Sequence, residues 1–193
     1  LAAKTSAVDS LIYRYRDLGH LQASTDPLSP EQAEHAELNL AAFGLTEDDL
    51  DRTFYPLRFP KHKATLREII DLLKETYCGK IGVEFMHIQD PKKRTWLKKR
   101  MEENRNQANL ARDEQLHILE KLQEATLFEA FLHRKFLGQK RFSLEGGEAI
   151  IPLLDTLLMQ AAERGVSDLI MGMAHRGRLN VLVNTLGKNP RDL

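Results

Sequence analysis

The sequence predicts an α/β protein, mostly α over its 193 residues, in which a predominantly helical first part precedes the start of a parallel-sheet domain. Up to about residue 136, apolar residues recur at helical spacing between clear helix starts and stops. After Gly138 a helix, a short apolar run, a glycine turn and a second helix follow in order, as in alternating helices and parallel strands. We therefore expect a helical domain over residues 1–106 and a truncated α/β domain over residues 107–193.

The composition excludes several classes of protein. Hydrophobic residues make up 42% of the chain and charged residues 29%, which is ordinary for a globular domain and argues against disorder. The 28 Lys and Arg residues balance 28 Asp and Glu residues, so no overall charge attracts nucleic acid. No apolar run approaches the roughly 20 residues of a membrane-spanning helix. The single cysteine, Cys78, excludes an internal disulfide, and we expect it to be a buried thiol in a reducing compartment.

Short helices with marked ends are predicted in the first sixty residues. Apolar spacing predicts a helix over residues 7–21, and Pro27 breaks the pattern that follows. Residues 29–32, Ser-Pro-Glu-Gln, have the composition of a helix start, and so do residues 46–49, Thr-Glu-Asp-Asp. Residues 51–60 are expected to form a loop rich in aromatic side chains.

The next forty residues hold two capped helices. Thr65 and Glu68 predict a capping box for a helix that runs to Tyr77 and ends at Gly79. Residues 81–86 are predicted to be a short strand or an extended connector. Asp90 followed by Pro91 predicts the start of a helix whose exposed positions are rich in lysine and arginine. The polar residues 104–109 then suggest a boundary.

The second part changes character. A long amphipathic helix is predicted over residues 110–136, and residues 140–147 form a turn that contains glycines. A helix over residues 149–162 precedes residues 168–173, which we expect to be a buried strand. A last helix is predicted over residues 178–186, closed by Gly187.

The turn between this expected strand and the last helix carries the strongest chemical pattern, Ala174-His175-Arg176-Gly177. Ligands of open parallel sheets bind at the carboxyl ends of strands, where a helix start offers N–H groups to an anion. Arg176 adds a permanent charge with a geometry that suits phosphate, and the imidazole of His175 can exchange a proton near neutral pH. The alternative is a surface turn with a solvated arginine and a histidine packed on a helix end.

Other candidate sites are weaker. Gly172 and Gly177 have the spacing of a phosphate-binding P-loop, but Arg178 and Leu179 stand where that motif needs Lys and then Ser or Thr. The basic helix around residues 92–100 could face nucleic acid or an anionic partner, but the zero net charge favours a solvated helix face instead. The seven histidines form neither HxxxH nor HExxH, so no zinc set is predicted.

Four blocks of sequence resemble a known family, the first, decarboxylating component of 2-oxoglutarate dehydrogenase. They are residues 13–20 (YRYRDLGH), 82–88 (GVEFMHI), 140–147 (KRFSLEGG) and 171–182 (MGMAHRGRLNVL). The last two blocks are specific, and the order of all four fits the family. The resemblance implies that the chain is an N-terminal fragment whose second domain begins a domain that binds thiamin diphosphate.

The resemblance also implies the chemistry. Family members use thiamin diphosphate and Mg²⁺ to decarboxylate a 2-oxo acid oxidatively. His175 matches a catalytic histidine that helps to bind the 2-oxo acid, and Arg176 matches a residue that contacts the cofactor. The metal ligands and the cofactor-activating glutamate of the family have no counterpart in this sequence, so we expect the fragment alone to be inactive.

Partners and compartment follow from the same resemblance. It implies 2-oxoglutarate as substrate, transfer of the succinyl group to the lipoyl group of a dihydrolipoyl succinyltransferase component in the tricarboxylic acid cycle, and a homodimer. We expect no nucleic acid or membrane partner, and a location in the bacterial cytoplasm, or the mitochondrial matrix if the source is eukaryotic. Two alternatives stay open. One is a related 2-oxoadipate dehydrogenase or decarboxylase, and the other is a non-catalytic helical interaction module.

Overall fold

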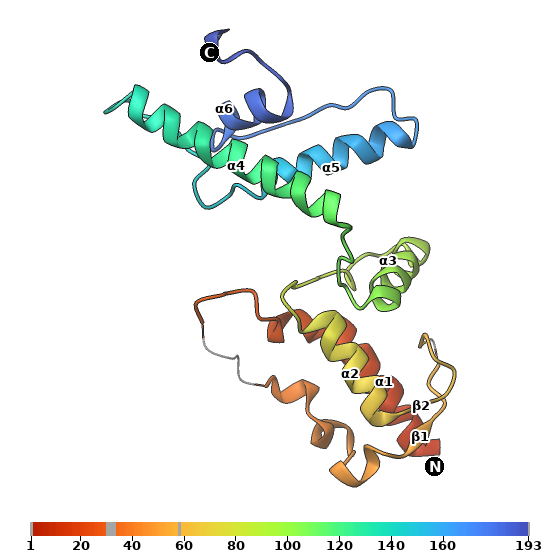
Figure 1. The fold of residues 1–193 in the computed structure, drawn as a ribbon. Helices are drawn as coiled ribbons and strands as arrows, with labels where there is room; N and C mark the ends of the chain where they lie inside the picture. Colours follow the sequence, from red (N-terminus) through yellow and green to blue (C-terminus); the bar gives the residue numbers. More distant parts are fainter. Residues whose placement is uncertain (1, 30–33, 58, 193) are drawn as a thin grey trace. The chain divides into compact units, whose positions relative to one another are not determined.

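A computed structural model describes residues 2–29, 34–57 and 59–192 of the chain (Figure 1). The chain divides into two compact units, Leu1–Asn109 and Leu110–Leu193, which are described separately below. Helices dominate both units, and the described residues contain a single sheet of two short strands. The helical character of the fold prediction is therefore confirmed, whereas the thiamin-binding assignment of the second unit stays a prediction.

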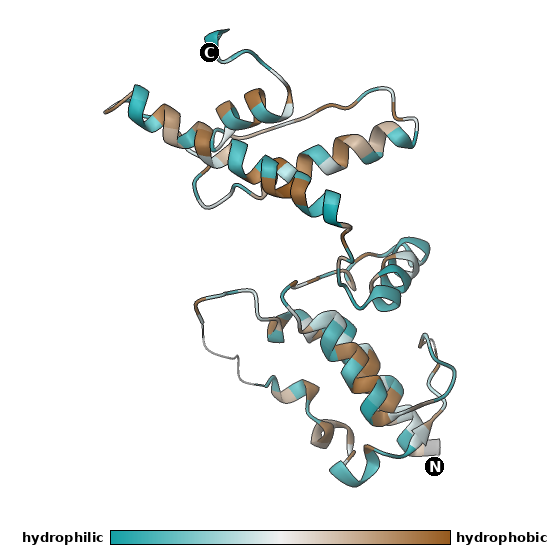
Figure 2. Cartoon of the chain, in the orientation of Figure 1, coloured by the Kyte–Doolittle hydropathy of each residue, from teal (hydrophilic) through white to brown (hydrophobic). Residues whose placement is uncertain are grey.

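Helices α1 (Ala2–Leu18) and α2 (Leu66–Tyr77) pack against each other in the first unit. The helix predicted over residues 7–21 is confirmed, but it begins earlier and ends in a 3-10 turn, Gly19–Gln22. Figure 2 shows hydrophobic residues along α2, and this face joins the core. The buried core side chains of the two helices are Val8, Leu11, Ile12, Tyr15, Leu66, Ile69, Leu73 and Tyr77.

Side-chain caps begin the helices where the sequence predicted them. The Thr65 side chain accepts the Glu68 N–H at 3.2 Å, and the Glu68 carboxylate accepts the Thr65 N–H at 2.8 Å, which completes the capping box of α2. Helix α3 (Pro91–Asn104) begins after Asp90, whose carboxylate accepts the N–H of Lys92 at 2.8 Å. Each cap satisfies N–H groups that the helix itself leaves unpaired.

The segments between these helices differ from prediction in two places. Within the residues expected to be a loop, strand β1 (Thr53–Phe54) pairs antiparallel with β2 (Ala64–Thr65). Residues 46–49 do start a helix, but it is only one 3-10 turn, Glu47–Asp49, as are Ala36–Leu38 and Leu40–Phe43. The start predicted at residues 29–32 lies largely outside the described residues. Residues 81–86 form a connector without strand pairing.

A buried ion pair ties three helices of the first unit together. The Arg16 guanidinium donates to both Glu102 oxygens, at 2.7 and 3.0 Å, and the Tyr77 hydroxyl donates to Glu102 Oε1 at 2.8 Å. Arg16 and Glu102 are 7% and 3% exposed. Because a buried charge is costly unless it is paired, this contact fixes how α1, α2 and α3 meet.

The second unit contains helices α4 (Arg112–Lys135), α5 (Ile150–Glu163) and α6 (Arg178–Asn180). Helix α6 continues as a wider π-helical turn, Val181–Thr185, and Pro190–Asp192 forms a final 3-10 turn. These positions confirm the three helices predicted in this part. The small buried core consists of Ala125, Leu144, Ile151 and Val181.

The buried strand predicted over residues 168–173 is wrong for this structure. These residues form no strand, and the Ile170 side chain is 98% exposed. A strand needs a neighbour to pair its N–H and C=O groups, and the described residues offer none beside this segment. Among the described residues, no helix is long and apolar enough to span a membrane.

Candidate functional site

The turn before α6 is built around Gly177. Its φ of +71° lies in the left-handed region, its N–H donates to the Phe142 carbonyl at 2.9 Å, and its carbonyl accepts the Val181 N–H at 3.0 Å. A Cβ at this position would lie 2.4 Å from Leu144 Cδ1. Both the backbone conformation and the contact with Leu144 therefore require glycine here. The turn and the segment 140–147 are joined by these contacts.

Arg176 links the same two segments through its side chain. Its Nη2 donates to the Glu145 carbonyl oxygen at 2.7 Å, and it lies 3.7 Å from where a Cβ on Gly146 would stand. The side chain is exposed, and no other partner of its guanidinium is found in the described part of the chain. Because a guanidinium has five N–H donors, most of them remain available to an anion.

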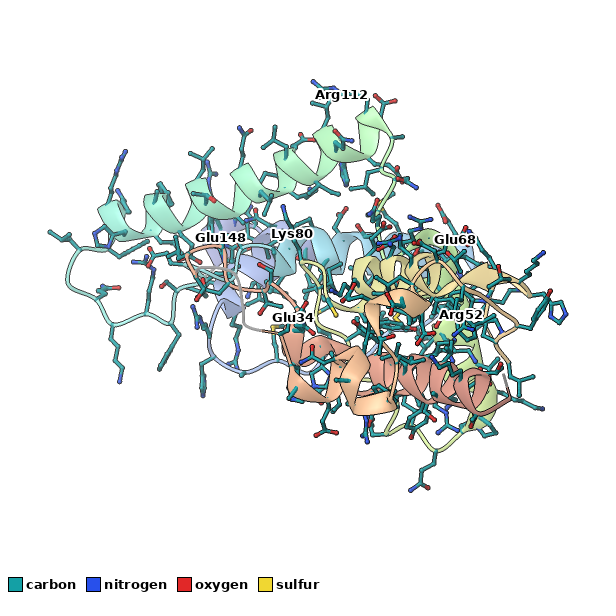
Figure 3. All side chains as sticks on the ribbon, turned by 90° about the horizontal axis from the view of Figure 1, so that it is seen from below. Glu34, Arg52, Glu68, Lys80, Arg112 and Glu148 are labelled. Atoms are coloured by element: carbon teal, nitrogen blue, oxygen red, sulfur yellow. The ribbon has the colours of Figure 1, made fainter. Side chains whose placement is uncertain are left out.

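A cavity of about 410 Å³ lies beside Arg176. Its lining is mostly apolar, with Arg176 as the charged member and with Gly146, Gly147 and Gly172 on its wall. The volume falls in the range of small-molecule sites. Glu148, labelled in Figure 3, closes the adjoining loop by accepting the Gly146 N–H at 3.0 Å. The glycines leave backbone close to the space that a ligand would occupy.

His175 lies next to Arg176 in the chain, but its ring has a different neighbour. The imidazole stacks on the Phe142 ring, with centroids 5.3 Å apart and planes 30° apart. His175 does not line the cavity that Arg176 lines. The role of Phe142 could not be predicted from local sequence, since its contact with His175 joins residues 33 positions apart. The only sequence feature that could have found it is its place in the KRFSLEGG block.

Two further arginines hold the site's backbone. Arg178 donates to the carbonyl oxygens of Ala174 and Met173, at 3.3 and 3.2 Å, so it braces the turn. Arg141 Nη2 donates to the Glu145 carboxylate at 3.3 Å, and the Ser143 hydroxyl donates to the same carboxylate at 3.1 Å. The residue whose carbonyl holds Arg176 is thus itself fixed by its neighbours.

The described residues do not gather a metal site. No group of three or more His, Cys, Asp or Glu side chains among them is arranged to hold a metal ion. Cys78 is half-buried, and burial raises the pKa of its thiol to about 11. A thiol with so high a pKa is a poor nucleophile at neutral pH, which fits the structural role expected for Cys78.

The basic helix α3 presents a separate surface in the first unit. Lys92, Lys93 and Arg100 are exposed, and the Trp96 side chain is 63% exposed. Another face of α3 lines a cavity of about 990 Å³ together with α1, Leu57, Phe59 and Pro60. This surface has positive charge and apolar area, but it contains neither His175 nor Arg176.

Comparison with known proteins identifies relatives along the whole chain. No protein-family model matches it. The 2-oxoglutarate dehydrogenase E1 component of Cupriavidus necator is 45% identical over 196 residues, which cover 100% of this chain and 21% of the relative. That of Azotobacter vinelandii is 44% identical over 186 residues, 95% of this chain and 20% of the relative. The 2-oxoglutarate dehydrogenase E1/E2 component of Corynebacterium glutamicum is 47% identical over 191 residues, 96% of this chain and 16% of the relative.

These matches confirm the resemblance found in the four sequence blocks. The chain spans about a fifth of the length of the E1 components it matches. Over the matched residues, the chain is homologous to a fragment of 2-oxoglutarate dehydrogenase E1 components, with 43 to 45% identity.

Proposed function

We propose that the chain is part of a 2-oxoglutarate dehydrogenase that decarboxylates 2-oxoglutarate oxidatively with thiamin diphosphate and passes the succinyl group to the lipoyl group of dihydrolipoyl succinyltransferase. The observation that carries the proposal is the identity of 43 to 47% with proteins named as 2-oxoglutarate dehydrogenase components. The complete protein would be a homodimer, and this segment alone would be inactive. Because the named relatives are bacterial, we propose the bacterial cytoplasm as its compartment.

The residues around Arg176 fit a diphosphate group. The guanidinium has unused N–H donors, and the cavity beside it is walled by glycines and apolar side chains. The guanidinium of an arginine can donate two parallel hydrogen bonds to phosphate oxygens, and this interaction is stronger and more directional than that of a single point charge such as a lysine. Thiamin diphosphate, when bound, supplies the carbon nucleophile and electron sink that the side chains of this segment lack. The Mg²⁺ ligands would come from residues beyond this chain.

His175 would bind the substrate. In this proposal its imidazole donates a hydrogen bond to the carboxylate of the 2-oxo acid or to negative charge that develops during decarboxylation, with proton transfer as a secondary role. The stacked Phe142 ring supports this role, because its contact with one face of the imidazole favours this orientation of the ring. A hydrogen-bond donor held in place before the reaction loses less free energy to reorganisation.

The test is carbon dioxide release from 2-oxoglutarate by the full-length protein, with and without thiamin diphosphate and Mg²⁺. We expect cofactor-dependent release that falls in both His175→Ala and Arg176→Ala, with Arg176→Ala partly rescued by excess cofactor. Arg164→Ala is a matched control, because the Arg164 side chain is exposed and, among the described residues, bonds only to Gln160. Absence of cofactor-dependent release from every 2-oxo acid tried would overturn the enzyme assignment.

The first alternative differs only in substrate. Turnover of 2-oxoadipate in preference to 2-oxoglutarate would assign the protein to a related dehydrogenase or decarboxylase with the same turn.

The second alternative is a non-catalytic interaction module, favoured by the exposed cations and Trp96 of α3. It predicts that reversing the charges of Lys98 and Lys99 abolishes assembly while His175 is dispensable. The enzyme assignment predicts the opposite dependence on His175.

A further inference from the structure

A carboxylate lies buried beneath the candidate site. Glu129 is on α4 and is 3% exposed. An ionised carboxylate at such a position is costly unless both of its oxygens have donors. The two donors come from two segments that are far apart in the sequence, and both segments belong to the candidate site.

One oxygen holds the segment 140–147. Glu129 Oε2 accepts from Arg141 Nε at 3.3 Å, and Arg141 Nη2 also reaches the Glu129 carbonyl at 3.4 Å and the Glu145 carboxylate at 3.3 Å. The carbonyl of Glu145 in turn accepts from Arg176. A chain of contacts therefore leads from Glu129 through Arg141 and Glu145 to the guanidinium of Arg176.

The other oxygen holds the start of α6. Glu129 Oε1 accepts from Asn180 Nδ2 at 3.1 Å. Asn180 is 0% exposed, its Nδ2 also donates to the Ala125 carbonyl at 2.9 Å, and its Oδ1 accepts from Asn184 Nδ2 at 2.7 Å. Because the Ala125 carbonyl can only accept, the amide orientation of Asn180 is fixed by chemistry. Asn180 lies three residues after Gly177, so its anchorage sets where the turn stands.

We propose that Glu129 is a positioning residue for cofactor binding. It clamps the segment 140–147 against the turn 174–177, and so keeps the Arg176 guanidinium where it meets a diphosphate. This proposal rests on the proposed function, but it concerns a residue on a different helix that touches neither cofactor nor substrate. The side chain acts only through Arg141 and Asn180.

The test is the affinity of the full-length protein for thiamin diphosphate in the presence of Mg²⁺, measured by titration calorimetry. Glu129→Gln keeps the shape, but its amide NH₂ faces either Arg141 or Asn180, and both are donors. We expect the dissociation constant to rise by about tenfold, the scale found when groups that orient a ligand-binding side chain are lost. Glu120→Gln on the exposed side of α4 is the control and should bind as the wild type does.

A double substitution separates positioning from a general structural effect. If Glu129 acts through Arg176, Glu129→Gln changes the affinity less than about twofold when Arg176→Ala is already present. An equal loss in both backgrounds would show that Glu129 only supports the fold, and would overturn the proposal. Wild-type affinity in Glu129→Gln would overturn it as well.

Two outcomes would prevent the comparison of Glu129→Gln with the wild type. If the wild type itself does not bind thiamin diphosphate, the proposed function fails, and the positioning role fails with it. If Glu129→Gln does not fold, Arg141→Lys takes its place. That variant keeps a positive charge beside Glu129 but loses the fork that also reaches Glu145, and it is judged by the same comparison with Arg176→Ala.

Discussion

Replacing Gly177 by alanine tests whether the turn depends on the absence of a side chain. Gly177 has a φ of +71°, and a Cβ there would lie 2.4 Å from Leu144 Cδ1 and 3.3 Å from Leu144 Cβ. Leu144 is a buried residue of the small core of this unit. The substitution therefore adds two separate costs, one to the backbone and one to the packing.

The magnitude follows from these two costs. A left-handed conformation costs a non-glycine residue about 1–2 kcal/mol, and overpacking a core by one methyl group costs about 1–3 kcal/mol. Gly177→Ala should thus lower the local free energy of opening by about 2–5 kcal/mol. Gly187 is the matched control, since its φ is +67° but no atom of a described residue other than its chain neighbours lies within 4 Å of its Cβ position. Gly187→Ala should cost only the backbone part, about 1–2 kcal/mol.

Hydrogen exchange of the full-length protein measures this cost locally. The reporters are the amides of Arg178 and Val181, which donate to the His175 and Gly177 carbonyls at 3.1 and 3.0 Å. We expect their protection to fall in Gly177→Ala by more than the protection of amides near residue 187 falls in Gly187→Ala. Equal losses in the two variants would refute the packing argument, and no loss in either would refute both parts.

Three further predictions concern the first unit. Glu102→Gln leaves the buried Arg16 without its counter-charge, so we expect the free energy of unfolding to fall by about 3–5 kcal/mol in urea titrations. Hydrogen bonds, first from Lys4 and second from Arg52, hold the pKa of the Asp49 carboxyl well below its usual range. Asp49 thus contributes stability that is complete above the ordinary aspartate pKa of about 3.9 and is lost as the pH falls below it. In Asp49→Asn the free energy of unfolding should therefore fall less steeply at low pH than in the wild type. Burial raises the pKa of the Cys78 thiol from its ordinary value of 9.0 to about 11, so this thiol should react with iodoacetamide at pH 8 about a hundredfold more slowly than an ordinary thiol.

Each of these has a contradicting result. Glu103→Gln, at an exposed neighbour, should cost less than about 0.5 kcal/mol, and an equal loss in the two glutamate variants would contradict the ion-pair argument. If Asp49→Asn loses stability at low pH just as the wild type does, the role given to Lys4 and to Arg52, the latter labelled in Figure 3, is wrong. Alkylation of native Cys78 at the rate of the unfolded chain would show that the thiol is not shielded.

Local chemistry explains which elements the sequence could predict. Helices α2 and α3 follow from the capping pairs Thr65–Glu68 and Asp90–Pro91, because a cap and its helix are neighbours in sequence. The two-residue strands β1 and β2 are too short to have a period, so nothing marked them. The expected strand at residues 168–173 was wrong for a different reason, since its apolar run needs a partner strand that the described residues do not provide.

The candidate site divides in the same way. Its turn could be predicted because His175, Arg176 and Gly177 are consecutive. The contacts that hold it could not, because Phe142 and Glu129 reach the turn only through the fold. Whether His175 and Arg176 perform the roles implied by the family stays a prediction.

The most direct test of the central claim is the affinity of the full-length protein for thiamin diphosphate, compared between wild type, Arg176→Ala and the control Arg164→Ala. If the turn before α6 binds the diphosphate, removing the guanidinium weakens binding by about 10- to 100-fold, as expected for the loss of a charge-assisted pair of about 1.5–3 kcal/mol, while the control is unchanged. Binding of equal strength in all three proteins would contradict the claim that this turn is the cofactor's anchor.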